Sequence, residues 1–294
     1  SFIATANAVR YCGAQPVFAD VAEDANLSPE TVREVLSPRT KAVLVVHQAG
    51  VPAPIEELRA LLDRLGVPLL EDAGCAAGST YRGRPVGAGA LMAGWSFHPR
   101  KLLTTGEGGM VTTDDPELAA RLRRLREHGM DVSATARHTA GRVVLESYLE
   151  TGFNYRMTDL QAAVGIVQLG RLDAIVARRR ELAANYHAAL TDLPELRLVR
   201  DPDYGTTNYQ SFWLVLPDHA PSQLEALQSL ADSGVSARRG IMASHREPAY
   251  AEHPHVPLPV TERLAQRSII LPVFDEMTDM EQGHVVDSLR RIVK

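Results

Sequence analysis

Residues 42–70 decide the fold: AVLVV at residues 42–46 precedes IEELRALLDRL at residues 55–65, and VPLL follows at residues 67–70. The first and last pieces are short apolar runs, as expected of strands that are buried on both faces. The middle piece repeats apolar residues at helical spacing and stops at Gly66. A strand, a helix and a second strand in this order predict a parallel sheet with crossover helices.

The pattern continues along the chain. We expect strands at residues 94–97 and 110–113, a helix at residues 116–128, and a long amphipathic helix at residues 158–190 that Thr158 or Asp159 caps. Further on we expect strands at residues 210–216 and 235–239, with helices at residues 221–232 and from residue 279. The predicted fold class is α/β, with a large domain at residues 1–190 and a smaller α+β domain at residues 191–294.

Composition narrows the class of protein. The chain has 31 Lys and Arg against 36 Asp and Glu, a formal charge of −5, which argues against a nucleic-acid-binding surface. No run approaches the roughly eighteen apolar residues of a membrane span. Cys12 and Cys75 lack the spacing of a metal site, and the start shows no signal peptide, so we expect a cytoplasmic protein without a metal. Because the chain begins Ser1-Phe2 without Met, we expect it to be cut from something longer.

Two segments could carry chemistry. Asp72 stands at the carboxyl end of the second predicted strand, where ligands bind in open α/β sheets, although an Asp there also caps turns. Ser96 ends another predicted strand, and Lys101 follows five residues later, before a glycine-rich loop. A carboxylate for a pyridinium nitrogen, a hydroxyl for a phosphate and a lysine for a Schiff base are the parts that pyridoxal phosphate (PLP) needs.

At this point the sequence resembles the PLP-dependent nucleotide-sugar aminotransferases of the DegT/StrS type, which have fold type I. The resemblance covers almost the whole chain and rests on several ordered motifs: FIATANA at residues 2–8, EDA at 71–73, SFHPRK at 96–101, GEGG at 106–109, GFNYRM at 152–157 and QAA at 161–163.

The resemblance implies roles around the cofactor. Lys101 would carry the cofactor and shuttle protons, Asp72 would bind the pyridine nitrogen, and Ser96 would bind a phosphate oxygen. Phe2 matches the position whose ring stacks on the cofactor, whereas from the residues alone we would expect a buried core Phe. Cys75 stands where many members have Gln or His facing the cofactor's phenolic oxygen, so that oxygen is held differently or Cys75 simply packs.

Two further residues are implied in binding. Asn154 looks like the residue that reaches the phosphate from the neighbouring subunit, which would make the protein a homodimer with shared active sites; otherwise it caps or turns the chain before the long helix. His245 is similar to a family histidine near the sugar-nucleotide; otherwise it is a surface-loop residue. The family also has several dozen residues before the position of Phe2, including a phosphate-binding turn, and that segment is absent from this sequence.

The expected function is transfer of an amino group, with glutamate as donor, to a nucleotide-linked keto-sugar in cell-surface polysaccharide or secondary-metabolite sugar biosynthesis. PLP-dependent sugar dehydration is the close alternative, but members doing it replace the lysine with His, so Lys101 favours aminotransfer. A truncated, non-catalytic dimerising or regulatory protein is a second alternative. A metal hydrolase using His245, His253 and His255 is a remote third, since no carboxylate stands at helical ligand spacing.

Overall fold

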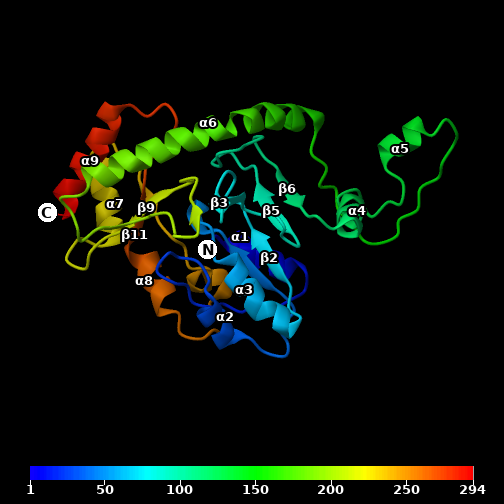
Figure 1. Cartoon of the computed structure of the whole chain (residues 1–294), viewed down its shortest axis with the longest axis horizontal. Coiled ribbons are helices and arrows are strands. Elements are labelled where there is room, and N and C mark those ends of the chain that lie inside the picture. The colour runs from blue at the N-terminus through cyan, green and yellow to red at the C-terminus, as the bar shows by residue number, and fades with distance from the viewer. Residues whose placement is uncertain (294) are drawn as a thin grey trace.

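A computed structural model describes residues 1–293 (Figure 1). Its central sheet has the order β1 (Val43–Val46), β2 (Leu69–Asp72), β5 (Ala93–Ser96) and β6 (Gly109–Thr112). β1, β2 and β5 are parallel, and β6 runs antiparallel to β5. The predicted α/β class with a mainly parallel sheet is therefore confirmed. Each of these strands also lies within two residues of its expected position.

The crossover helix α3 (Ile55–Leu62) joins β1 to β2 and packs against the sheet. Leu58 and Leu62 are fully buried on its inner face, in one cluster with Val45 of β1 and Leu69 of β2. A short 3-10 turn, Asp63–Leu65, follows, and Gly66 ends it with φ +64°, a conformation that glycine adopts without strain. The strand–helix–strand unit read from residues 42–70 is confirmed.

Helices α1 (Ile3–Tyr11) and α2 (Pro29–Val35) precede this unit. The loop after β2 forms a small three-stranded sheet in the order β4 (Arg84–Pro85), β3 (Thr80–Tyr81) and β8 (Gly205–Thr206). Because β8 comes from a part of the chain more than 100 residues later, this sheet ties the C-terminal third of the molecule to the loop after β2.

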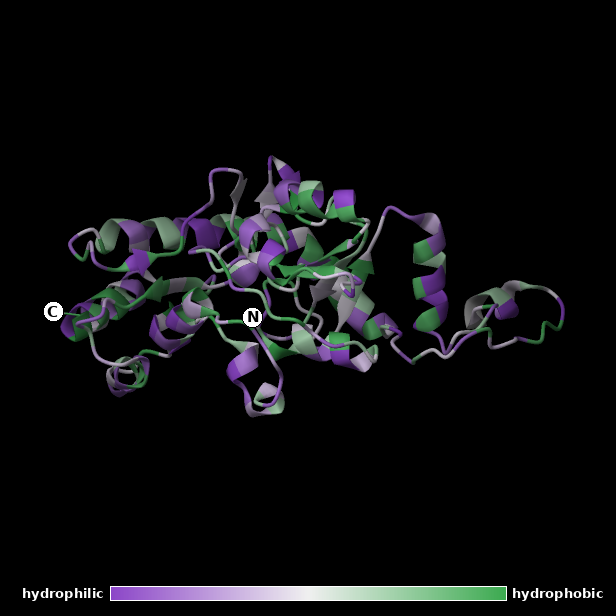
Figure 2. Ribbon diagram, turned by 90° about the horizontal axis from the view of Figure 1, so that it is seen from below, coloured by the Kyte–Doolittle hydropathy of each residue, from purple (hydrophilic) through white to green (hydrophobic). Residues whose placement is uncertain are grey.

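The C-terminal third has its own antiparallel sheet, ordered β10 (Arg238–Arg239), β11 (Ser268–Leu271), β9 (Phe212–Val215) and β7 (Arg197–Leu198). Helices α7 (Gln223–Asp232), α8 (Pro259–Arg267) and α9 (Asp279–Val293) accompany it, and the largest buried apolar cluster lies among these elements. Figure 2 shows hydrophobic residues gathered along the inner strands. The smaller α+β region is thus confirmed, whereas the division at residue 190 stays a prediction.

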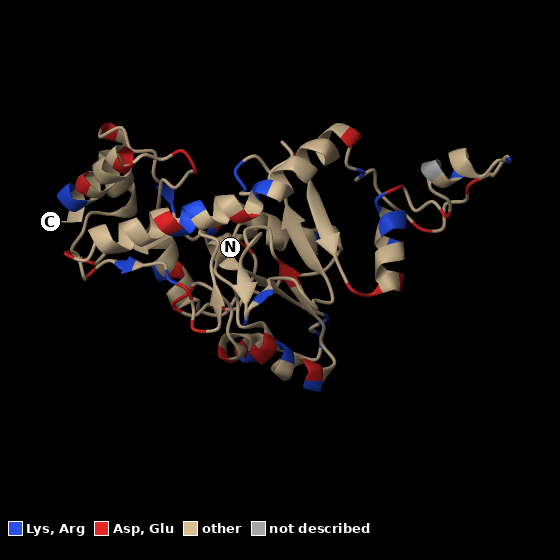
Figure 3. Ribbon diagram, turned by 45° about the horizontal axis from the view of Figure 1, so that its top comes forward, with Lys and Arg blue, Asp and Glu red and all other residues tan. Residues whose placement is uncertain are grey.

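Helices α4 (Pro116–Leu125), α5 (Ala134–Thr139) and α6 (Asp159–Ala189) connect the two regions. α4, α5 and the chain around them extend away from the body as an arm (Figure 1). Glu150 of this arm accepts hydrogen bonds from Arg121 and Arg124 of α4, at 3.0 and 3.3 Å. Figure 3 shows acidic and basic residues scattered over the molecule, and α4 carries both.

The long helix α6 begins where the sequence predicts, and Thr158 is its N-cap in a capping box with Gln161. Only its C-terminal half is amphipathic as expected, with Leu182 and Tyr186 fully buried. The apolar residues in the N-terminal half lie at the surface, since Leu160 is 82% exposed and Val167 is also exposed. This half of α6 runs beyond the C-terminal core that buries the other half (Figure 1).

By length and composition, α6 could cross a membrane, which our reading of the sequence did not anticipate. A single helix of this kind is a weak indication of a span, because core helices and signal sequences satisfy the same criteria.

Candidate active site

Asp72 and Ser96 lie at the carboxyl ends of two neighbouring parallel strands, β2 and β5. The two carboxylate oxygens of Asp72 have different partners. Oδ1 accepts from the backbone N–H of Gly74 at 3.0 Å. Asp72 therefore caps the turn after β2, which is the alternative role that the sequence left open for it. Oδ2 accepts from the hydroxyl of Thr5 at 2.7 Å. A carboxylate has room for further donors, so Asp72 caps the turn and is still able to bind a pyridinium nitrogen.

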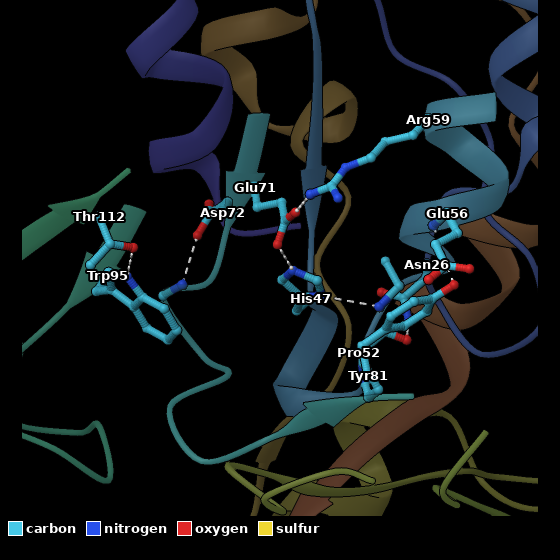
Figure 4. Close-up of polar contacts among 12 residues, drawn as sticks. Asn26, His47, Pro52, Glu56, Arg59, Glu71, Asp72, Tyr81, Trp95 and Thr112 are labelled. Carbon is cyan, nitrogen blue, oxygen red and sulfur yellow. Dashed lines mark hydrogen bonds and ion pairs between the residues drawn. The ribbon is translucent and has the colours of Figure 1, made fainter. Parts of the chain in front are cut away.

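Glu71 and Asp72 point to opposite faces of β2, as successive residues of a strand do (Figure 4). Glu71 is buried and bonds Arg59 at 2.8 Å and His47 Nε2 at 3.2 Å. His47 Nδ1 accepts from the N–H of Ala53 at 3.0 Å, which assigns the ring proton to Nε2 and makes it the donor to Glu71. These hydrogen bonds hold β2 in place on the face opposite to Asp72.

Lys101 and Cys75 meet although they belong to different loops. The amine Nζ of Lys101 lies 3.0 Å from Cys75 Sγ, and the backbone N–H of Lys101 donates to the carbonyl of His98 at 2.9 Å. Cys75 follows β2 and Lys101 follows β5, so both reach the sheet edge that carries Asp72 and Ser96. The predicted grouping of these residues is what the fold produces.

Gly74 shows how close these groups are. A Cβ built on Gly74 would lie 3.0 Å from Asp72 Oδ1 and 3.5 Å from the Cβ of Ser96. A side chain at this position would therefore fill the space between the carboxylate and the serine.

Phe2 is 60% exposed and directly precedes α1, so the expectation that it is a core residue is wrong. Thr5, which bonds Asp72, is in the first turn of the same helix. Phe2 therefore stands near the candidate site with its ring uncovered, and its stacking on a cofactor stays a prediction.

His245 is buried within the 3-10 turn Ser244–Arg246, so its interpretation as a surface-loop residue is wrong. Its Nε2 lies 3.2 Å from Glu262 Oε1, and its ring centroid lies 4.7 Å from that of His255. Burial lowers the pKa of His245 and outweighs the hydrogen bond with Glu262, which acts in the opposite direction. Among the described residues, no group of His, Cys, Asp or Glu is placed to hold a metal ion.

Asn154 lies on the arm and forms an isolated β-bridge with Glu127. Since Thr158 is the N-cap of α6, the alternative in which Asn154 caps that helix is wrong. A role in turning the chain stays open. Its expected contact with a phosphate in a neighbouring subunit stays a prediction.

Three residues at the site were missed by sequence reasoning. Thr5 holds Asp72, and its one signal was its place in the FIATANA motif. Gln210 accepts from the N–H of Leu102 at 3.1 Å, and Asn208 donates to the carbonyl of Cys75 at 2.9 Å. No local pattern marked these two amides, because their partners lie more than 100 residues earlier in the chain.

Comparisons with known proteins agree with this geometry. Residues 1–290 match the family model described as the DegT/DnrJ/EryC1/StrS aminotransferase family. The aminotransferase TlmJ from Streptoalloteichus hindustanus is 34% identical with a TM-score of 0.89, covering 99% of this chain and 76% of its own. DesI, solved in the presence of its TDP-sugar product, is also 34% identical with a TM-score of 0.89, over 99% and 72% of the two chains. Helicobacter pylori PseC, an aminotransferase involved in the biosynthesis of pseudoaminic acid, is 26% identical with a TM-score of 0.92, over 100% and 77%.

The residues present fit PLP. The site offers a carboxylate for the ring nitrogen at Asp72, a hydroxyl at Ser96 and an amine at Lys101, and Gly74 adds no side chain between Asp72 and Ser96. The likeness to these structures confirms fold type I. A PLP-binding donor set at the carboxyl ends of β2 and β5, together with a family match over nearly the whole chain, places this protein among the PLP-dependent aminotransferases, as a member of the DegT/DnrJ/EryC1/StrS aminotransferase family.

Proposed function

We propose that this aminotransferase moves an amino group from glutamate to a keto-sugar carried on a nucleotide, in the biosynthesis of a cell-surface polysaccharide or secondary-metabolite sugar. The convergence of Asp72, Cys75 and Lys101 at one sheet edge carries the proposal. The relatives support the substrate class, since DesI was solved with a TDP-sugar product and PseC serves pseudoaminic acid biosynthesis.

The chain's own groups have distinct tasks in this reaction. PLP, when bound, supplies an electron sink for the charge left when a proton leaves the carbon that bears the amino group. Asp72, oriented by Thr5 and by the N–H of Gly74, places a negative charge beside the ring nitrogen. Ser96 offers its hydroxyl to the phosphate. Lys101 Nζ would take the proton from the donor carbon and pass it to the cofactor within the first half of the reaction, and it would move a proton in the opposite direction, from the cofactor to the sugar carbon, when the sugar gains the amine.

Sugar dehydration is the second candidate. By the resemblance, members that dehydrate sugars carry His at the lysine position, whereas this chain has Lys101. The non-catalytic alternative predicts a colourless protein, and the proposal predicts a yellow one once PLP is added.

We also propose a homodimer with shared sites, acting in the cytoplasm. The exposed apolar residues on the N-terminal half of α6 support it, because a concentration of exposed apolar side chains is typical of an interface. They include Leu160, Ile166 and Leu169. The arm adds exposed Val143 and Leu145.

The test uses the two half-reactions separately. PLP-loaded protein mixed with glutamate alone should release 2-oxoglutarate in an amount that matches the bound cofactor and then stop. Addition of a TDP-linked keto-sugar should yield the amino-sugar nucleotide by mass spectrometry. A product lacking water but not gaining nitrogen would support dehydration, and release of no 2-oxoglutarate would contradict glutamate as donor.

A further inference from the structure

The segment Thr207 to Gln210 connects β8 to β9 and touches both loops of the candidate site. Gln210 bonds the peptide groups on either side of Lys101. Its Oε1 accepts from the N–H of Leu102 at 3.1 Å, and its Nε2 donates to the carbonyl of Arg100 at 2.9 Å. One side-chain amide thus brackets the lysine and restricts rotation of the backbone that carries it.

Asn208 makes the matching contacts to the other loop. Its Nδ2 donates to the carbonyls of Cys75 and Ala77, at 2.9 and 2.7 Å. Its Oδ1 accepts from the backbone N–H of Gln210 at 2.8 Å, which links the two amides. Through Asn208 and Gln210, the loop after β2 and the loop after β5 are held in a fixed position relative to each other.

The segment itself is rigidly held. Asn208 is fully buried, and a Cβ on Gly50 would lie only 2.0 Å from its Oδ1. Arg179 and Arg180 of α6 donate to the carbonyls of Tyr209 and Thr207, at 3.1 and 2.7 Å. The amides therefore have little freedom to follow a moving loop.

Tyr209, between the two amides, has φ +48° although it is not glycine. Such a conformation is strained for a residue other than glycine and persists where surrounding contacts determine it. With Tyr209 in this conformation, both flanking side chains bond the site loops.

We propose that Gln210 and Asn208 are positioning residues that hold Lys101 beside Cys75 and Asp72 for reaction with the cofactor. This inference rests on the proposed role of Lys101. It adds that residues of the small C-terminal region position the lysine. The packing of the two regions against each other is therefore coupled to the position of the Lys101 amine.

Gln210→Met tests the inference, because Met keeps the length of the side chain and loses both hydrogen bonds. We expect the rate at which PLP becomes attached to Lys101 to fall roughly 10- to 100-fold, as expected of a small misplacement of a reacting group. Borohydride trapping at successive times, followed by peptide mapping, measures this rate. We also expect the pH midpoint of the bound cofactor's absorbance to shift.

Gln223→Met is the matched control. Gln223 Nε2 also donates to two backbone carbonyls, those of Ala265 and Ser268 at 3.0 and 2.6 Å, but these lie in the C-terminal region away from Lys101. This variant should lose a similar amount of thermal stability and keep the wild-type attachment rate and pH midpoint. Equal slowing in both variants would overturn the proposal, and so would a wild-type rate and midpoint in Gln210→Met.

A double variant separates positioning from a general effect on the pocket. In Lys101→Ala protein, where PLP binds without attachment, adding Gln210→Met should leave cofactor affinity unchanged. A further loss of affinity would show that Gln210 acts on the pocket and not through Lys101, which overturns the inference. If trapping in the wild-type protein labels a different lysine, the proposed role of Lys101 fails instead.

Discussion

The amine of Lys101 lies within hydrogen-bond distance of the thiol of Cys75, 3.0 Å away and 26 residues earlier in the chain. Two strand ends of the central sheet bring them together, since Cys75 follows β2 and Lys101 follows β5. The thiol of Cys75 therefore lies beside the amine of Lys101, to which we expect PLP to attach.

This contact predicts selective protection of one cysteine. Cys75 is half-buried and Cys12 is exposed, and both are free thiols. Iodoacetamide should alkylate both in the protein without PLP, whereas saturating PLP should slow alkylation of Cys75 and leave Cys12 unaffected, as measured by peptide mass spectrometry. Equal rates at Cys75 with and without PLP would place the cofactor elsewhere.

Lys101 should be the residue that carries the cofactor. After borohydride reduction of the yellow protein, peptide mapping should find the pyridoxyl group on Lys101. Lys41 and Lys294 are the other lysines of the chain, and an adduct on either of them would refute the assignment.

Asp72→Asn should abolish transamination and leave the fold intact. A neutral amide cannot stabilise the protonated ring nitrogen, so we expect a loss of roughly 10²- to 10³-fold in 2-oxoglutarate release, the range for removal of one electrostatic stabiliser. Exposed Asp218 provides the control variant Asp218→Asn, which should keep full activity. Near-normal turnover by Asp72→Asn, with an unchanged melting temperature, would contradict the role of Asp72.

Shared sites in a homodimer predict complementation. Asn154→Ala and Lys101→Ala proteins, each weakly active or dead alone, should regain part of their activity when their subunits are exchanged. The mixed dimer restores one site, with Lys101 from one chain and Asn154 from the other. If mass spectrometry shows exchange and no activity returns, Asn154 is left with a structural role on the arm.

Asp20 should make folding stability depend on pH. It accepts hydrogen bonds from Val21, from Val260, and from both the backbone and the hydroxyl of Thr261, so it caps the start of α8 from 240 residues away. Partial burial raises the pKa of Asp20, but these hydrogen bonds outweigh it and hold the pKa below its ordinary value of 3.8.

Because the pKa of Asp20 is lower in the folded protein, its ionised carboxylate stabilises the fold fully at pH values above the pKa that Asp20 has in the unfolded chain. This stabilisation is lost as the pH falls through the pKa that Asp20 has in the folded protein. Asp20→Ala should therefore cost about 1–2 kcal/mol at pH 7, as loss of a helix cap does. Urea unfolding should show the difference from wild type shrinking as the pH is lowered from about 4 through the folded pKa. A difference that stays constant over this range would show that the charge of Asp20 contributes nothing.

The sequence by itself determined the strands of the central sheet, the crossover helix and the cap of α6, because periodicity, glycine stops and capping residues act within a few positions of the chain. It also located Asp72 and Lys101, since a residue just after a buried strand must lie at the sheet edge.

Only the tertiary structure decided how those residues are held. Thr5 meets Asp72 across 67 positions, and Gln210 meets Leu102 across 108, so these hydrogen bonds exist only once separate elements have docked. The prediction of a buried Phe2 and the surface-loop alternative for His245 were wrong for the same reason. Hydropathy specifies what a side chain prefers, whereas the packing of distant segments determines whether anything covers it.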